Sequence, residues 1–509
     1  MEDGLRSLFW FYESKAWYFE GEEAFNSAAK ALSNPGDVDE EKIEHLEFLI
    51  SNLRVRQAWF LSRQSRYKEA QNILEARQVW FAFRQAGTED PETALPTLVE
   101  STLAEKDPEG LWVNAGVEVN TLYGQGNYEA ARHFLEWYDE HFRSWPWAKA
   151  QTNANLGRIA GALGDYEKAR QLLQEALEIL RPLGDQVSVM LYLHTLGGIL
   201  RILGDAGEAR QLFQESLDLA EAHNYPMGKV LALGDLGNLA YAEGEYKSAK
   251  DYFDSSQILS EEIGDNRGRA LALTNLGRVA TVLGEYDEAR RLFEQGLPIT
   301  AQSGNRRGTA LTLNRLSGVH LQMGDLDKAE TLCQESWEIC QELGYRKGAI
   351  LAQITHGEIA LEREEFRPAG VFFQGSLENS ENMGFVLGIM RSEIGLGRTA
   401  FGIGDLKQAE CHLWRGLVIG GESRQQRTEL SALLTLAEIL IAAGEPKKGV
   451  ELSSLAASHP AADHQTMEKA NSELEMLKSN LTPAEFTTLV AHGWELTLDA
   501  VRETHIDPN

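Results

Sequence analysis

The sequence has few residues that would interrupt helices or cross-link them. Its 509 residues include only 13 prolines, which leaves room for long helices. Three cysteines occur, Cys333, Cys340 and Cys411, and they form no CxxC pair and no zinc-ligand spacing. We therefore expect three reduced thiols in the protein core, as is typical of a cytoplasmic protein.

Basic residues are also scarce. The 48 lysines and arginines are outnumbered by 77 acidic residues, which gives a net charge of −29. A field of this sign repels nucleic-acid phosphates and anionic membranes, so we expect neither as a partner. The N-terminal stretch MEDGLRSLFWFYESKAW lacks the apolar core of a signal peptide. The longest nearly apolar segment, LSALLTLAEILIAAG, contains Glu438 and is too short to span a bilayer. Together these features predict a cytoplasmic location.

The motifs of common enzymes are missing as well. The sequence has no HExxH, no GxSxG, no EF-hand loop, no GxGxxG after a strand and no GxxxxGK[ST]. The 12 histidines have no metal-ligand spacing, and two of them, His320 and His356, fall at helix positions expected to face the core. Carboxylates are so frequent that no pair stands out as a general acid and base. We expect no catalytic residue, no metal and no cofactor, and therefore a protein that is not an enzyme.

What the sequence does contain is a repeat with a period of forty residues. LGRIAGALGDYEKARQLL, starting at Leu156, returns almost unchanged as LGRVATVLGEYDEARRLF at Leu276. A glycine recurs at forty-residue spacing, with one glutamate in the series: Gly164, Gly204, Gly244, Gly284, Gly324, Glu364, Gly404 and Gly444. The next residue is always acidic, and a small residue follows five positions after the glycine, from Ala169 to Gly449. Another small residue precedes it by seven positions: Gly157, Gly197, Gly237, Gly277, Ser317, Gly357, Gly397 and Ala437.

Each recurring residue has a physical cause. The glycine at 164 and its equivalents can end a helix in the left-handed conformation, which costs glycine no Cβ clash. The acid that follows caps the next helix or complements its dipole. A glycine in the middle of a helix costs about 1 kcal/mol relative to alanine, so the series at Gly157 indicates close approach of another backbone. We expect the Ala169 series to supply the opposing surface across the turn.

A second set of helix-breaking residues closes each unit: Gly184, Asn224, Gly264, Gly304, Gly344 and Gly384. Each unit is then two antiparallel helices, each about 24 Å long. Such a pair cannot bury both its faces alone, but stacked neighbours can. The sequence therefore predicts an all-α fold, an α-solenoid of antiparallel helix pairs. We expect irregular helical pairs in residues 1–145, eight forty-residue repeats in 146–460 and a C-terminal helical cap in 461–509.

These residues resemble the tetratricopeptide repeat family in its longer, forty-residue form. The paired small residues, the LGDY turn and the phenylalanine series at Phe293 carry the resemblance, which covers about 146–460. A further unit at GQGNYEAARHFLEWY, with Gly126, Tyr128 and Ala131, extends it backward. The resemblance implies a right-handed superhelix whose first helices line a concave groove, where extended protein or peptide ligands bind.

The two ends resemble the borders of the repeat region in bacterial STAND-class signalling ATPases. The opening LFWFYESKAWYFEGEEAF and the tail LTPAEFTTLVAHGWELTLDAVRE carry this second resemblance. In that family a nucleotide-binding switch precedes a tetratricopeptide sensor. Because GxxxxGK[ST] is missing, the chain would be a sensor without its ATPase, with an upstream NTPase domain as a further partner. Two alternatives stay open: a self-standing adaptor that bridges proteins, and the regulatory subunit of a separately encoded enzyme.

The predicted ligand-binding residues lie on the first helix of each pair, on the face opposite Leu276 and Ala280. Asparagine amides there suit a peptide backbone, because each offers a donor and an acceptor. The longer members of the family use asparagines in this way. The candidate groove residues are Asn155, Arg158, Arg201, Asp235, Asn238, Tyr241, Asn275, Arg278, Arg315, Glu358 and Arg398. The arginines concentrate before residue 330 and the acids after it, so we expect a groove that is basic first and acidic later.

Two questions stay open at the level of sequence. Any one of these side chains could be ordinary solvated surface that pairs with its neighbour, as Arg398 could with Glu358. An aromatic cluster near the N-terminus could be core between the first helices or a docking face for an upstream domain. Its members are Phe9, Trp10, Phe11, Tyr12, Trp17, Tyr18 and Phe19.

Overall fold

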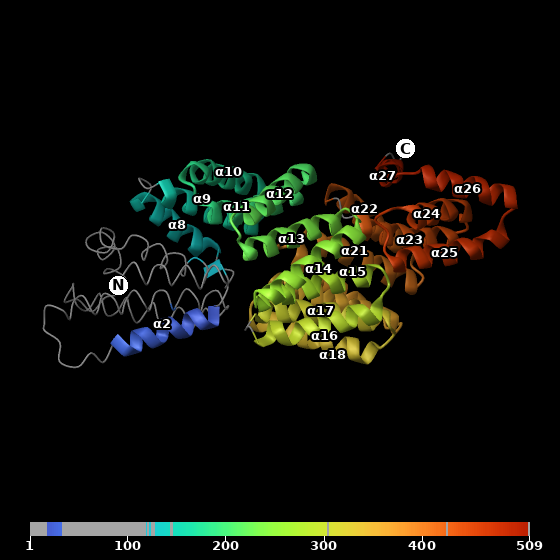
Figure 1. Cartoon of the computed structure of the whole chain (residues 1–509). Helices are drawn as coiled ribbons and strands as arrows, with labels where there is room; N and C mark the ends of the chain where they lie inside the picture. The colour runs from blue at the N-terminus through green and yellow to red at the C-terminus, as the bar shows by residue number, and fades with distance from the viewer. Residues whose placement is uncertain are drawn as a thin grey trace, which may run out of the picture. The chain divides into compact units, whose positions relative to one another are not determined.

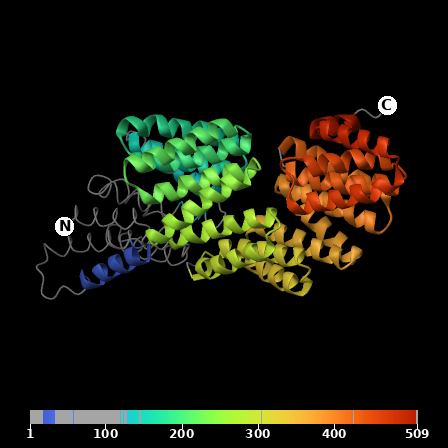
Figure 2. The ribbon, with the colours of Figure 1, turned by 45° about the vertical axis from the view of Figure 1, so that its right-hand side comes forward.

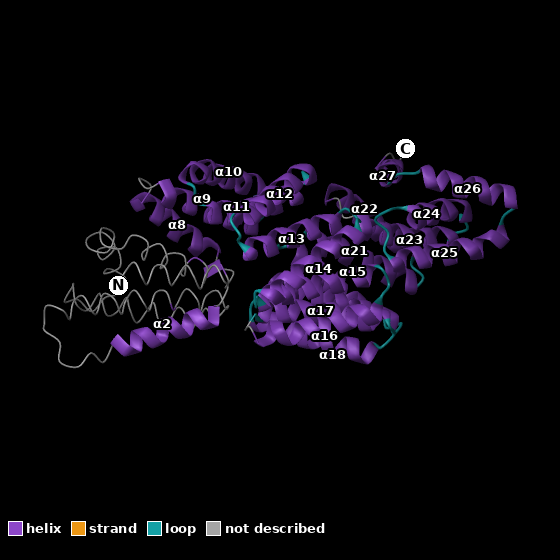
Figure 3. Cartoon of the chain, viewed as in Figure 1, coloured by secondary structure: helices purple, strands orange, loops and turns teal. Residues whose placement is uncertain are grey.

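The structure is a computed structural model, and every regular element in its described part is a helix (Figure 3). The described residues are 18–32, 57, 119, 122–123, 128–142, 146–302, 305–423 and 426–506. Most of the N-terminal aromatic cluster and the turn at Gly304 lie outside this part of the chain. Helices α9 to α24 follow one another through the repeat region with short turns between them (Figure 1).

The helices of the repeat region have nearly uniform length. They are α9 (Pro146–Leu163), α10 (Tyr166–Leu183), α11 (Gln186–Leu203), α12 (Ala206–Ala222), α13 (Pro226–Ala242), α14 (Tyr246–Glu262), α15 (Asn266–Val282), α16 (Tyr286–Gln302), α17 (Arg306–Gln322), α18 (Leu326–Glu342), α19 (Arg346–Glu362), α20 (Phe366–Glu381), α21 (Val386–Gly402), α22 (Leu406–Ser423), α23 (Gln426–Ala442) and α24 (Pro446–Ser458). The flanking elements are α2 (Tyr18–Leu32), α8 (Tyr128–Phe142), α25 (His464–Leu477), η2 (Lys478–Asn480), α26 (Pro483–Glu495) and α27 (Leu498–Ile506).

The helices form two compact units, whose border crosses helices α13 to α16. Unit 1 comprises Met1–Leu236, Ser255–Arg269 and Ile299–Asn305; unit 2 comprises Gly237–Asp254, Ala270–Pro298 and Arg306–Asn509. Within unit 1, α9 packs on α10, α10 on α11 and α11 on α12. Within unit 2 the same holds from α17 to α25, as the successive colours in Figure 2 illustrate. This succession of packed antiparallel helices confirms the predicted α-solenoid.

The turns form where the glycine series predicted them. Gly164 has φ +91°, its N–H donates to Gly161 O, and the N–H of Asp165 donates to Ala160 O at 2.9 Å. This pattern satisfies carbonyls that the end of the helix would otherwise leave without partners. The described members of the second series are also left-handed: Gly184, Asn224, Gly264, Gly344 and Gly384, with φ 48° at Asn224. Glu364 takes the same left-handed conformation, with φ 58°, although it carries a Cβ.

The small residues in mid-helix contact large side chains more than backbone, which corrects one expectation. A Cβ built on Gly197 would lie 2.4 Å from a ring carbon of Phe213, and one on Gly277 would lie 2.8 Å from Phe293. Backbone approaches closely at Gly157, where a Cβ would meet Ala169 O at 3.2 Å. The glycines therefore make room for the phenylalanine rings. Phe213 and Phe293 are 1% exposed and are among the largest fully buried side chains of the described residues.

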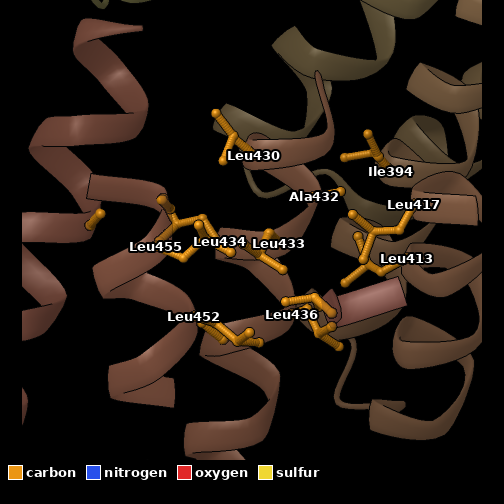
Figure 4. Packing of buried hydrophobic residues seen from close by; sticks show 14 of the residues in the cluster. Ile394, Leu413, Leu417, Leu430, Ala432, Leu433, Leu434, Leu436, Leu452 and Leu455 are labelled. Atoms are coloured by element: carbon orange, nitrogen blue, oxygen red, sulfur yellow. The ribbon is translucent and has the colours of Figure 1, made fainter. Parts of the chain in front are cut away.

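The C-terminal helices extend the core of unit 2. Leu433, Leu436 and Leu455 of α23 and α24 belong to one apolar cluster that also contains Ala470 of α25 and Leu498 of α27 (Figure 4). A capping box forms at the start of α26: Thr482 Oγ1 accepts the N–H of Glu485, and Glu485 Oε2 accepts the N–H of Thr482. The tail thus covers apolar surface of the last repeats.

Predictions for single core residues mostly hold. His320 and His356 are buried, as expected, and His356 Nδ1 lies 3.1 Å from Glu330 Oε1. Cys333 and Cys340 are buried, but Cys411 is exposed, so the prediction of three core thiols is wrong for that residue. Cys411 lies two positions after the buried Ala409, which turns its side chain away from the core-facing side of α22.

One described helix, Gln186–Leu203, is long and apolar enough to cross a membrane by length and composition alone. It is α11 of the repeat region. Val189, Leu193, Leu196 and Leu200 are buried along it, and it packs on α10 and α12. Burial of these four residues in the helical stack accounts for part of its apolar character, while Val187, Leu191 and Ile202 are exposed.

Candidate functional site

The predicted binding residues fall on the first helices, and each unit carries its own set. We call the surfaces that bear them the first-helix faces. Unit 1 holds Asn155, Arg158, Arg201 and Asp235; unit 2 holds Asn238, Tyr241, Asn275, Arg278, Arg315, Glu358 and Arg398. Arg201 is exposed, Tyr241 and Asn275 are buried, and the other eight are partly exposed.

An asparagine and an arginine three residues apart form the same arrangement in both units. On α9, Arg158 Nη1 donates to Asn155 Oδ1 at 3.0 Å, and the guanidinium carbon lies 5.0 Å from the centre of the Tyr123 ring. On α15, Arg278 Nη1 donates to Asn275 Oδ1 at 2.9 Å, and its guanidinium carbon lies 4.2 Å from the Tyr241 ring centre. The helix spacing of three residues places both groups on one face.

This arrangement gives the asparagines a specific task. The amide oxygens of Asn155 and Asn275 are occupied by arginines, and Asn155 Nδ2 donates to the carbonyl of Gln151 at 2.9 Å. Asn238 Oδ1 is a further acceptor for Arg278 Nη1, at 3.0 Å. Amide and tyrosine together hold each guanidinium plane in place, which reduces the side-chain entropy that a further contact of the arginine would cost.

In unit 1 the first-helix face also contains a histidine–carboxylate pair. His194 Nδ1 on α11 is in contact with Asp235 Oδ2 on α13. Desolvation lowers the pKa of the His194 imidazole, but the Asp235 carboxylate raises it more, and the net shift is upward. This pair ties two successive first helices together. His194 follows the buried Leu193, and the sequence reasoning missed it because its partner comes from the next repeat.

The later acids of unit 2 are neutralised by neighbouring helices. Glu358 Oε1 of α19 lies 2.8 Å from Arg391 Nη2, and Arg398 Nη2 lies 3.2 Å from Glu362 Oε1. Arg398 therefore pairs with Glu362 and not with Glu358. Lys469 Nζ lies 2.7 Å from Glu438 Oε1. These pairs cancel much of the negative charge expected on the later first helices.

Sequence reasoning missed Arg427, which approaches the face from the start of α23. Its Nη1 donates to Tyr241 Oη at 2.6 Å, although the two residues are 186 positions apart. A regularity in the sequence could have drawn attention to it. Arg267, Arg307, Lys347 and Arg427 share one position in the repeat, in the first turn of the first helix. Arg307 and Lys347 also lie over aromatic rings, those of Tyr345 and Phe385.

The chemistry available at these faces is recognition by charge, amide and aromatic groups. Within the described residues, no group of three or more histidine, cysteine, aspartate or glutamate side chains is placed to hold a metal ion. Burial raises the pKa of Cys340 to about 11, so its thiol stays protonated and is a poor nucleophile at neutral pH.

Comparison with known proteins places the repeats in a family. The tetratricopeptide repeat model matches residues 149–222 and 230–302, and a second tetratricopeptide repeat model matches 309–343. A search of curated proteins finds no match to the chain.

Solved structures resemble the chain at low sequence identity. The crystal structure of a Rap protein complexed with competence and sporulation factor aligns with 84% of this chain and 99% of its own, at 10% identity and a TM-score of 0.49. BtubC from P. vanneervenii covers 44% of this chain and 91% of its own, at 20% identity and a TM-score of 0.35. A STAND protein with a tetratricopeptide repeat sensor from Pyrococcus horikoshii aligns with 72% of this chain at 15% identity and a TM-score of 0.41, and this chain spans 56% of its length.

Proposed function

Because the chain is a tetratricopeptide repeat protein, we propose that it functions by recognition and not by catalysis, and that its first-helix faces bind a protein or peptide ligand. Stacked repeats leave one side of their first helices open to a partner. The observation that carries this proposal is the repeated Asn–Arg–Tyr arrangement. Arg158 and Arg278 are each fixed on a partly exposed face by an asparagine amide and a tyrosine ring.

The arrangement differs from the ordinary surface of the repeats, where many arginines pair with acids on their own helix. Arg170 of α10 lies 2.6 Å from Glu167, and Arg290 of α16 lies 2.8 Å from Asp287. Ion pairs of this kind on a solvated helix surface contribute little and attract no partner. Arg158, in contrast, contacts an amide and a ring, which orient the guanidinium without neutralising its charge.

Affinity purification from cells of the source organism, followed by quantitative mass spectrometry, tests the proposal. We expect the Arg158→Gln and Arg278→Gln variants together to lose the partners that the unchanged chain recovers. The matched control changes Arg170 and Arg290 to Gln, which removes the same charge from second helices. Recovery of the same partners in the same amounts by both double variants would contradict a role for the first-helix faces.

At a finer level, we propose that the chain is the sensor part of a STAND-type regulator. The sequences of the two ends support this assignment, and the adaptor and regulatory-subunit functions are the alternatives. Determining the full reading frame separates them: a P-loop NTPase encoded in frame upstream of these repeats supports the sensor. Co-purification of a separately encoded enzyme whose rate changes with the chain supports a regulatory subunit instead.

A further inference from the structure

Two turns of unit 2 are covered by a segment that lies far away in the sequence. A Cβ built on Gly244 would lie 3.3 Å from Pro460 O, and a Cβ built on Gly284 would lie 2.5 Å from Cγ of His464. The turns that follow α13 and α15 are therefore in contact with the loop between α24 and α25 and with the first residue of α25. A Cβ on the equivalent turn glycines of later repeats would meet nothing within 4 Å: Gly324, Gly404 and Gly444.

An arginine makes a second contact between the same parts of the chain. Arg427, in the first turn of α23, donates from Nη1 to Tyr241 Oη at 2.6 Å across 186 positions, a separation of several forty-residue repeats. The Tyr241 ring is buried and packs edge to face on Tyr246 of α14, with the ring centres 5.7 Å apart. Burial lowers the pKa of the Arg427 guanidinium, but Tyr241, Tyr246 and Asp463 together raise it more, so the arginine stays charged.

These contacts depart from the usual architecture of a solenoid, in which each repeat contacts only its neighbours. They bypass the helices from α17 to α22 and join α13–α16 directly to α23 and the α24–α25 loop. Unit 2 therefore closes on itself. We call Arg427 and residues 459–464 the clasp.

The clasp has a fixed shape on its C-terminal side. Ala461 and Ala462 are buried in the apolar cluster that α23, α24, α25 and α27 share. The N–H of Ala461 donates to His459 Nδ1 at 3.1 Å, and Asp463 Oδ1 accepts the N–H of Thr466 at 2.8 Å. Because the loop is already ordered by these contacts, its closure on the two turns costs little conformational entropy.

On the side of α13–α16 the contact is small. Within the described residues it rests on packing against glycine turns and on the hydrogen bond to Tyr241, whereas paired helices bury whole rings such as Phe253 and Phe293. The guanidinium groups of Arg278 and Arg427 both lie over the Tyr241 ring, so their like charges oppose closure. Local opening is easiest where few apolar contacts are broken, so the clasp can open while the helices of unit 2 stay folded.

We propose that the clasp is an autoinhibitory contact, which closes over the Tyr241 part of the first-helix face and has to open before a partner reaches it. The inference rests on the proposed function, because Tyr241 is one of the predicted binding residues. It adds a regulatory step: in the closed form Tyr241 is buried and its hydroxyl is bound by Arg427. A partner that binds only the open form has its apparent affinity reduced by the fraction of the chain that is closed.

Hydroxyl-radical footprinting of the full chain, followed by mass spectrometry, measures the exposure of the Tyr241 side chain. We expect Gly284→Asn to open the clasp, because its side chain would clash with the His464 ring. Asparagine itself tolerates the left-handed conformation, as Asn224 does in this chain with φ 48°. The oxidation rate of Tyr241 should rise about tenfold, the shift in an open-to-closed ratio that a clash of this kind produces.

The matched control is Gly324→Asn. Gly324 has φ +78° against +76° for Gly284, but nothing lies within 4 Å of its Cβ position, so this variant should leave Tyr241 protected. The buried Tyr192 of unit 1 is the internal reference, whose oxidation should not change in either variant.

A second-site change separates opening of the clasp from local misfolding. His464→Ala removes the ring that causes the clash, so adding it to Gly284→Asn should return the oxidation of Tyr241 to the level of His464→Ala alone. Circular dichroism confirms that each variant keeps its helices. The inference is overturned if Tyr241 is oxidised equally in Gly284→Asn and Gly324→Asn, or if His464→Ala does not reverse the increase.

The inhibitory role is tested by the affinity purification described for the proposed function. Gly284→Asn should recover severalfold more of the cellular partners than Gly324→Asn does. Equal recovery by the two variants, when only Gly284→Asn exposes Tyr241, would overturn autoinhibition.

The two hypotheses fail separately. Greater recovery by Gly284→Asn of partners that do not depend on Arg158 and Arg278 would support the clasp and contradict the proposed function. Equal recovery by Gly284→Asn and Gly324→Asn of partners that do depend on these arginines would support the proposed function and overturn the clasp as an inhibitor.

Discussion

Two adjacent glycines of α11 should respond to the same substitution with opposite signs. A Cβ on Gly197 would lie 2.4, 2.8 and 2.9 Å from three ring carbons of Phe213, whereas a Cβ on Gly198 would meet nothing within 4 Å. Phe213 is 1% exposed, so its ring has no space to retreat into. Changing Gly197 to alanine therefore tests the clash with the Phe213 ring. Changing Gly198 to alanine tests only the lower helix propensity of glycine.

The magnitudes follow from these contacts. Overpacking a filled core costs about 1–3 kcal/mol, and a contact as short as 2.4 Å places Gly197→Ala near the upper end of that range. The gain in helix propensity offsets about 1 kcal/mol. We expect Gly197→Ala to destabilise unit 1 by about 2 kcal/mol and Gly198→Ala to stabilise it by up to about 1 kcal/mol.

Repeats elsewhere in the chain suggest how the clash could be relieved. Where a larger residue replaces the glycine, the residue sixteen positions on is smaller than phenylalanine: Cys333 follows Ser317, and Ser453 follows Ala437. Phe213→Cys alone should cost several kcal/mol through the cavity it leaves, about 3–5 kcal/mol for a loss approaching Phe→Ala. Combined with Gly197→Ala, the total should fall short of the sum by about 1–3 kcal/mol, since the added methyl group occupies part of that cavity.

Hydrogen exchange of amides in α11 and α12 is the suitable assay, because a solenoid need not unfold as one cooperative unit. Urea unfolding followed by circular dichroism provides the global comparison. The reasoning is refuted if these amides are as well protected in Gly197→Ala as in Gly198→Ala. It is also refuted if the destabilisation by Gly197→Ala and that by Phe213→Cys simply add in the double variant.

Two further perturbations test the turns and the buried acids. Glu364 has φ 58°, so Glu364→Gly should relieve left-handed strain and stabilise unit 2 by up to about 1 kcal/mol. Gly324→Ala, in the equivalent turn of another repeat, should destabilise unit 2. Urea unfolding that shows both variants shifting stability in the same direction would contradict this. Burial raises the pKa of Glu473 to about 8, and the charge of Glu438 contributes. Because the folded pKa lies above the unfolded one, the associated stability is present below about pH 4.5 and is lost as the pH rises through about 8. Glu473→Gln should reduce the change in unfolding free energy with pH between about pH 4.5 and 8. If urea unfolding at several pH values gives the variant the same pH dependence as the unchanged chain, Glu473 is not protonated in the folded state.

Local features of the fold could be predicted from the sequence because they depend on neighbours along the chain. A left-handed residue such as Gly164 and the acid after it provide hydrogen-bond partners for backbone groups at the helix ends only a few residues away. The positions of such pairs in the sequence therefore predict the turns. Residue type alone would not predict the turn at Glu364, because glutamate disfavours the left-handed conformation. Its position in the forty-residue repeat does predict it.

The candidate site could be predicted only in part, because its contacts cross repeats. The face that carries Asn275 and Arg278 follows from helical spacing. Asn275 lies three residues before Arg278 on the same helix, so their hydrogen bond also follows from that spacing. That Arg278 lies over Tyr241, and that Asn238 also accepts from it, depends on packing between neighbouring first helices. Arg427 reaches Tyr241 from 186 positions away, a separation at which no local pattern operates. Its position within a basic series of the repeat was the available indication.

The central claim is that the first-helix faces bind the partner. A photo-crosslinking amino acid placed at the partly exposed Thr281, on the first helix α15, tests it inside the cell. The exposed Glu294 on the second helix α16 is the comparison position. The account predicts that the chain with the probe at 281 forms a covalent adduct with a partner polypeptide, and that the probe at 294 does not. An adduct formed at 294 but not at 281 would contradict it.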